Sequence, residues 1–236
     1  QNFLNMMFAV PAEQYMVPPD DDKILNQILI LYSDHEQNVS TSTIRLVGSS
    51  EANLFACVNA GLCALWGARE AHANIPPIPM LEHMLNHQMS PEKYFERFIQ
   101  GREVLRSNGL GHKGYDVEDP RSRIGRKLFH AYYKANKDRS DPLIQKALEV
   151  EEFTLGHTYF KEMRLYPNVD FYSALIFRMI GIPSTMNNVI RAIGKLSGWL
   201  AHWHEQRAEG ENKPMRPHQI YVGQTEKPYI PLRDRK

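Results

Sequence analysis

The segment Leu165-Tyr166-Pro167-Asn168-Val169-Asp170-Phe171-Tyr172-Ser173 holds a single carboxylate among apolar and aromatic residues. Proline cannot continue a preceding helix and asparagine is a good N-cap, so the segment predicts a new helix whose first turn contains Asp170. Asp170 has two interpretations: it complements the positive end of the helix dipole, or it is a general base in a cleft from which its neighbours exclude water. Other features of the sequence are needed to distinguish these two roles of Asp170.

Helical patterns dominate on both sides of this segment. No sustained alternation of polar and apolar residues indicates a strand, so the sequence predicts an all-α fold. A short extended piece is expected over 219–222. Caps, prolines and apolar periodicity predict helices over 23–33 after Asp20–Asp22, 40–47, 51–66 after Ser49 and Ser50, from Pro79, 91–106, 120–136, 142–164, 170–180 and 184–207.

Composition narrows the class of protein. The chain has 236 residues, 42% hydrophobic and 23% charged, which is enough for one large or two small domains. A formal net charge of +1 gives no reason to expect nucleic acid or a membrane surface as a partner. The most apolar run, 54–66, is too short to span a bilayer. Cys57 and Cys63 point to different faces of one predicted helix, so we expect reduced thiols and a cytoplasmic protein.

Candidate catalytic and binding residues lie in and near a glycine-rich loop. Gly109-Leu110-Gly111 could let a ligand approach the backbone, or it could be an ordinary turn. His112 could hydrogen-bond or protonate a carbonyl group while Arg121 grips a carboxylate by its planar fork. The alternatives are a helix-flanking polar residue for His112 and a surface ion pair for Arg121.

Two further patterns bear on ligands. Lys195 lies on an apolar helix, where a buried ammonium group needs an acidic partner or an anionic ligand. His83 and His87 are spaced to share a helix face, but a third ligand and a nearby glutamate are missing. We therefore expect no metal site.

Several motifs occur along the chain in the order of one known family. They are 33–38, 40–43, Arg45, 48–50, 109–112, 119–121, 167–173, 198–203, 216–217 and 219–223. Taken together, they resemble the citrate synthase family. The resemblance covers essentially the whole chain and implies an all-α fold made of part of the large domain plus the small domain. It divides the chain into a large-domain part (1–75), the small domain (76–182), and a return to the large domain with a C-terminal arm (183–236).

The resemblance implies roles for individual residues. Asp170 matches the aspartate that abstracts a proton, and His112 matches the histidine that assists attack on the carbonyl of oxaloacetate. Arg121 and Arg216 match arginines that bind substrate carboxylates, the second across the family's dimer. No cofactor is expected to stay bound, and a CoA thioester is a candidate substrate. The loop expected to contact it comprises Asn108, Gly109, Leu110 and Gly111.

Other family positions differ. The histidine that polarises the thioester carbonyl aligns with Glu70, with His72 two positions later. An ionised Glu70 would repel a developing enolate, whereas a protonated Glu70 could donate a hydrogen bond to it. His72 reaching the site by another backbone path is a third alternative. The oxaloacetate-binding histidine aligns with Tyr32 and a further carboxylate-binding arginine aligns with Lys195, so both are expected to contact substrate.

In the family, roughly half of the polypeptide precedes the stretch that matches this chain. The resemblance therefore predicts a split enzyme in which a separate N-terminal-half subunit completes each protomer within a higher oligomer; the alternative is a fragment. The expected function is that of a citrate synthase-like acyltransferase or lyase subunit with an altered active site. Its expected substrates are a polycarboxylate or 2-oxo acid and an acyl-CoA thioester. A non-catalytic metabolite-binding or structural subunit is the alternative.

Overall fold

The computed structural model describes residues 3–11, 15–67, 77–101, 109–112, 115, 117–209, 213–216, 218–226 and 228–235. Within these ranges the chain forms α-helices and short 3-10 turns and no strand, which confirms the all-α prediction. The α-helices are α1 (Phe3–Phe8), α2 (Pro19–Tyr32), α3 (Val39–Gly48), α4 (Leu54–Trp66), α6 (Ile78–Asn86), α7 (Pro91–Ile99), α8 (Pro120–Ala135), α9 (Pro142–Gly156), α10 (Thr158–Glu162), α11 (Val169–Ile180) and α12 (Asn187–Ala208). The 3-10 turns are η1 (Lys137–Arg139), η2 (Ser184–Met186) and η3 (Leu232–Asp234).

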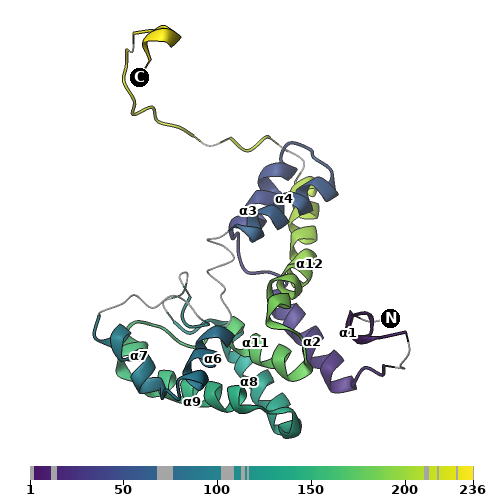
Figure 1. The fold of residues 1–236 in the computed structure, drawn as a ribbon. Helices are drawn as coiled ribbons and strands as arrows, with labels where there is room; N and C mark the ends of the chain where they lie inside the picture. The colour runs from purple at the N-terminus through teal and green to yellow at the C-terminus, as the bar shows by residue number, and fades with distance from the viewer. Residues whose placement is uncertain are drawn as a thin grey trace.

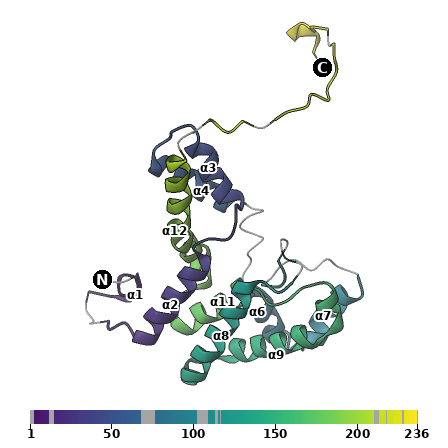
Figure 2. The ribbon, with the colours of Figure 1, turned by 180° about the vertical axis from the view of Figure 1, so that it is seen from behind.

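The helices form two groups joined by α2 and the long helix α12 (Figure 1). In one group α8 packs against α11 and α9 packs against α6, α7 and α10; in the other, α3 and α4 pack against α12. The view from behind shows the same division, with the C-terminal segment after α12 leading away from the helices (Figure 2). The start of α11 lies where the two groups meet.

Several helix boundaries differ from the sequence predictions. The helix predicted over 91–106 ends at Ile99, and the one predicted over 184–207 begins with the 3-10 turn η2 and continues as α12 from Asn187. Helix α2 begins at Pro19, so the three aspartates lie in its first turn instead of capping it. The helix predicted from Glu51 begins at Leu54, because Glu51 adopts a positive φ of 64° and the Asn53 side chain supplies the cap. The helix predicted over 142–164 is broken after Gly156, where the His157 side chain caps the short α10.

Helix α11 is the centre of the larger hydrophobic core. Every residue from Val169 to Phe177 is buried, including Asp170. Residues of α2 such as Ile28 belong to the same core, so this core crosses the expected boundary near residue 75. The division at 75 and 182 stays a prediction. A carboxylate within this helix needs nearby partners, because an uncompensated buried charge is costly.

A smaller core joins α3, α4 and α12 through Ile44, Cys57, Leu65 and Trp199. The opposite face of α4 is uncovered by any described residue: Phe55 is 79% exposed and Trp66 85% exposed. Both cysteines are free thiols, Cys57 buried and Cys63 exposed. In the described part of the chain, no helix has the length and apolar character needed to cross a membrane.

Candidate functional site

Asn168 begins α11 as the sequence predicts. Its side-chain Oδ1 accepts hydrogen bonds from the backbone N–H of Asp170 at 3.0 Å and of Phe171 at 3.1 Å. Its Nδ2 donates to the carbonyl of Gly111 at 3.0 Å, and its backbone N–H donates to the carbonyl of Gly109 at 2.8 Å. One residue therefore fixes both the helix that carries Asp170 and the loop that carries His112.

The glycine-rich loop packs directly against the start of α11. Gly109 and Gly111 adopt positive φ values of 80° and 73°, which favour glycine. A Cβ on Gly109 would lie 3.2 Å from Cβ of Phe171, and one on Gly111 would lie 2.9 Å from Cδ2 of Leu165. Leu110, also expected to contact a CoA thioester, is buried and pairs with Pro167. These glycines allow the close approach that places His112 beside α11.

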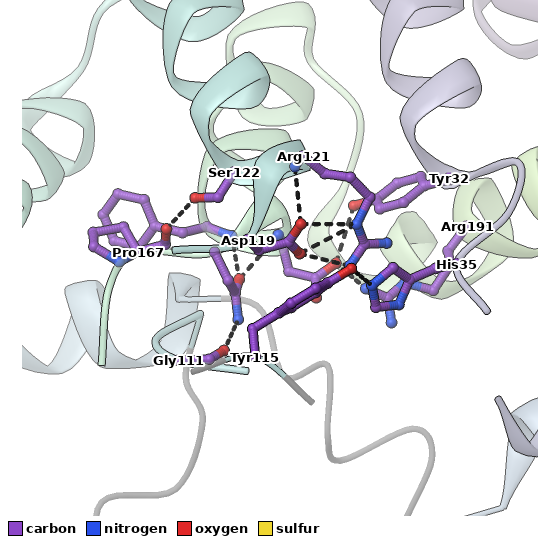
Figure 3. Close-up of polar contacts among 12 residues, drawn as sticks. Tyr32, His35, Gly111, Tyr115, Asp119, Arg121, Ser122, Pro167 and Arg191 are labelled. Atoms are coloured by element: carbon purple, nitrogen blue, oxygen red, sulfur yellow. Dashed lines mark hydrogen bonds and ion pairs between the residues drawn. The ribbon is translucent and has the colours of Figure 1, made fainter. Parts of the chain in front are cut away.

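Asp170 is 8% exposed and has two charged or polar partners from other helices. The Tyr32 hydroxyl, at the end of α2, donates to Oδ1 at 3.1 Å, and the Arg191 guanidinium of α12 forms an ion pair with the same oxygen. No hydrogen bond to Oδ2 comes from a described residue. The Tyr32 hydroxyl also shares a short hydrogen bond with that of Ser173. Figure 3 shows Tyr32 and Arg191 on the same side of the site.

Two imidazoles lie next to one another beside this ion pair. The rings of His35 and His112 meet edge to face with centroids 4.8 Å apart. Nε2 of His35 lies 2.8 Å from the Tyr115 hydroxyl (Figure 3). Neither the motifs nor the family resemblance indicated His35, Tyr115 or Arg191 as individual site residues. His35 follows Tyr32 by three residues within the motif 33–38, so that motif could have indicated it.

Arg121 is positioned by a buried acid. Its Nη2 and Nε contact Oδ2 of Asp119 at 2.7 and 3.2 Å, and Asp119 also caps α8 by accepting the backbone N–H of Arg121 at 2.8 Å. Asp119 is only 4% exposed, so this pair differs from an exposed surface ion pair. Asp119 therefore fixes the position of the guanidinium, as Figure 3 shows, and the charge of Arg121 acts on both imidazoles.

The charges of the site act on the imidazoles. Burial, followed by the positive charge of Arg121, lowers the pKa of His35 to about 4. Desolvation and then Arg121 also lower the pKa of His112, which keeps some exposed surface. Burial opposes ionisation of Asp119, but the hydrogen bond and charge of Arg121 hold its pKa below the usual range. Both imidazoles are therefore neutral near pH 7 and able to donate or accept a hydrogen bond.

Helix α12 contributes two buried cations one turn apart. Arg191 is 6% exposed and Lys195 is 7% exposed. The Arg191 guanidinium lies 5.2 Å from the ring centroid of Tyr32, and the charge of Lys195 acts on His35. Arg121, Arg191 and Lys195 thus lie near Asp119 and Asp170, and the charge of Glu36 also acts on His112. Among the described residues, these three cations are the groups suited to bind an anionic ligand.

A metal ion is a weaker interpretation of the same cluster. One donor atom each from His35, His112 and Asp119 lies within 4.8 Å of the others. However, both oxygens of Asp119 already accept hydrogen bonds from Arg121. The neighbouring cations would also repel a divalent ion.

Not every predicted site residue lies in this cluster. Glu70, His72 and Asn108 fall outside the described residues. Arg216 is exposed in the C-terminal segment, which runs away from the helices (Figure 1). The described part of this chain brings together Asp170, His112, Tyr32, Arg121 and Lys195.

The fold and site define a class of protein. A family model described as the C-terminal domain of citrate synthase matches residues 1–218. The chain therefore belongs to the citrate synthase family.

Two kinds of relatives agree with this membership. Citrate synthase 1 of Mycobacterium tuberculosis is 43% identical over 233 residues, which are 98% of this chain and 54% of that protein. The crystal structure of citrate synthase from Pyrobaculum aerophilum is similar with a TM-score of 0.78 and 32% identity, covering 99% of this chain and 55% of that one. A ternary complex of citrate synthase from Thermoplasma acidophilum with carboxymethyl coenzyme A and oxaloacetate has a TM-score of 0.80 and 28% identity, covering 99% and 59%. The chain thus spans little more than half the length of these relatives.

Proposed function

We propose that this chain is the catalytic part of a citrate synthase-like acyltransferase or lyase that acts on a dicarboxylate or 2-oxo acid and an acyl-CoA thioester. The observation that carries the proposal is the convergence of five separate segments on one cluster. These segments supply Asp170, the two neutral imidazoles of His35 and His112, the buried cations Arg191 and Lys195, and the partly exposed Arg121.

The arrangement supports a separate role for each of these residues. Arg121, held in a fixed plane by Asp119, suits bidentate binding of a substrate carboxylate. His112 and His35 are suited to hydrogen-bond a carbonyl oxygen that gains negative charge during C–C bond formation or cleavage. Asp170 is the proposed proton acceptor. The Thermoplasma acidophilum enzyme was solved with carboxymethyl coenzyme A and oxaloacetate, which supports a thioester and a 2-oxo dicarboxylate as the substrate classes here.

We further propose that the reaction differs from ordinary citrate synthesis. The resemblance aligns Glu70 with the histidine that polarises the thioester carbonyl in the family. A carboxyl group there supports enolate formation only when it is protonated, because an ionised one would repel the enolate. The thioester half of the site is therefore where this chain departs most from its family.

The proposal includes a partner that supplies the other half of the fold. Phe55 and Trp66 leave an apolar face of α4 uncovered, and such faces mark interaction sites. The chain covers about 54% of its M. tuberculosis relative, so the remaining part of that fold is a suitable partner for this face. Arg216, exposed on the C-terminal segment, is proposed to reach the site of another protomer.

The test is co-expression with an N-terminal-half citrate synthase polypeptide from the same source, followed by a thiol-release assay. We expect oxaloacetate-dependent release of CoA from acetyl-CoA or a related thioester, and a loss of at least about 100-fold in Asp170→Asn, in line with general base contributions. Asp138→Asn, an exposed acid in η1, is the matched control and should keep full activity. Unchanged turnover in Asp170→Asn would refute the role of Asp170.

A non-catalytic metabolite-binding subunit is the second candidate function. The observation that favours it is the ion pair between Arg191 and Asp170, which occupies the proposed base. This candidate predicts saturable dicarboxylate binding without thiol release in the same assays.

A further inference from the structure

The proposed base, Asp170, forms a buried ion pair with Arg191 of α12. Arg191 and the Tyr32 hydroxyl both contact Oδ1 of Asp170. The pair is buried, with the Arg191 side chain 8% exposed and that of Asp170 11% exposed. A carboxylate whose charge is already balanced by a guanidinium accepts a proton less readily. The site without ligand therefore contains a restrained base.

We infer that Arg191 is a substrate-operated latch on Asp170. It holds the carboxylate while the anion site is empty, and its guanidinium passes to a carboxylate of the dicarboxylate substrate when that substrate binds. This inference rests on the proposed function and adds Arg191 to the groups that recognise the substrate.

The position of Arg191 allows such a transfer. Arg191 lies one turn before Lys195 on the buried face of α12, and its charge acts on His112, while Arg121 acts on both imidazoles. Its guanidinium is therefore within electrostatic reach of Asp170 and of the anion site together. The Tyr32 ring lies beside the guanidinium and supplies a surface along which it can shift.

The exchange moves the guanidinium from one carboxylate to another and leaves Asp170 with a hydrogen-bond donor. A guanidinium has five N–H donors, so it can begin to bind the substrate carboxylate before leaving Asp170. The released Asp170 keeps the hydrogen bond from Tyr32 and presents Oδ2, which no described residue occupies. It then takes the proton from the carbon next to the thioester carbonyl, and the electron pair of that C–H bond stays on the substrate as the enolate. The order explains how one chain could bind the dicarboxylate first and abstract the proton second.

The test compares dicarboxylate affinity in four proteins by isothermal titration calorimetry, using oxaloacetate and, as a non-reacting probe, malate. They are the wild type, Asp170→Asn, Arg191→Met and the double variant, each in the assembly in which it purifies. Removing the competing carboxylate in Asp170→Asn should tighten binding, by about tenfold. Arg191→Met should weaken binding about 10- to 100-fold, the loss expected for one charge-assisted interaction.

Arg191→Met leaves Asp170 buried without its cation, so this variant can fail to fold. The double variant removes that charge as well and keeps the test valid. Residue 170 is neutral both in Asp170→Asn and in the double variant. The ratio of their dissociation constants for the dicarboxylate therefore gives the contribution of Arg191 to binding. We expect about 10- to 100-fold tighter binding in Asp170→Asn. Arg178→Met, which breaks the more exposed pair between Arg178 and Asp141 at 2.6 Å, is the matched control and should bind as the wild type does.

Two results would overturn the inference and are distinguishable. If the wild type binds dicarboxylates but Asp170→Asn and the double variant bind equally well, the ion pair is only structural and the proposed function stands. If the wild type binds no dicarboxylate, the proposed function fails and the latch fails with it.

Discussion

Asn168 ties the backbone of Gly111 to the first turn of α11: its Nδ2 donates to the Gly111 carbonyl at 3.0 Å while its Oδ1 caps the helix. Gly111 immediately precedes His112, and the cap is two residues before Asp170. One side chain thus sets the relative position of the proposed acid–base pair.

This double role can be separated by mutation. Asn168→Ala should lower the free energy of unfolding by about 1 kcal/mol through loss of the cap, measured by urea denaturation. It should also weaken dicarboxylate binding, because His112 loses its tether. Asn53→Ala removes an equivalent cap, at the start of α4, where the side chain accepts from Ala56 N–H at 3.0 Å. This control should lose similar stability and keep its affinity; equal losses of affinity in both variants would contradict the tether.

The loop glycines give a second prediction. Gly111→Ala should destabilise the chain through both the positive φ and the contact of the new Cβ with Leu165. Gly101 also has a positive φ, 68°, so Gly101→Ala has the same backbone strain. Its new Cβ would have no heavy atom within 4 Å. We expect about 1–2 kcal/mol from the φ term in each variant and a further loss only for Gly111→Ala. Thermal and urea unfolding would measure the difference, and identical losses would show that the loop can move away from α11.

The histidine next to the anion site should make stability depend on pH. His35 has a pKa of about 4 in the folded protein, against an ordinary value near 6.5, so the unfolded chain binds more protons between these values. Stability should therefore fall as the pH is lowered from about 6.5 to about 4, and this contribution should be constant above that window. Urea unfolding between pH 4 and 7 should show a shallower slope for His35→Gln. If the dependence of stability on pH were the same in His35→Gln, burial and Arg121 would not lower the pKa of His35 in the folded protein.

The uncovered face of α4 should be needed for assembly. Phe55→Ser together with Trp66→Ser should abolish association with the N-terminal-half polypeptide in size-exclusion chromatography. The stability of the isolated chain should change little, because both side chains are mainly exposed. Ile220→Ser, which alters an equally exposed residue of the C-terminal segment, should leave association intact. Association that survives the double change would place the partner elsewhere.

Much of the fold could be predicted from local sequence. Proline and asparagine at 167 and 168 fixed the start of α11, and Asp119 before Pro120 fixed that of α8, because caps act through backbone groups only two or three residues away. The start of α4 was placed too early because Ser49 and Ser50 look like a cap in sequence. In the structure they bond back to α3, their hydroxyls donating to the carbonyls of Leu46 and Val47.

The composition of the site could be predicted only in part. The resemblance to the family indicated Asp170, His112, Arg121 and Lys195, which the structure places together. Arg191 could not be found this way, since its importance depends on the packing of α12 beside the start of α11 and not on any nearby motif. The ion pair joins residues 21 positions apart, and no local pattern encodes such a contact.

The most direct test of the central claim, that these segments form an anion site for a dicarboxylate, is calorimetric titration of oxaloacetate into the wild type and Arg121→Ala. We predict one saturable site in the wild type and at least a tenfold loss of affinity, about 1.4 kcal/mol, in the variant. Equal affinity in the two proteins, or no binding to either, would contradict the account.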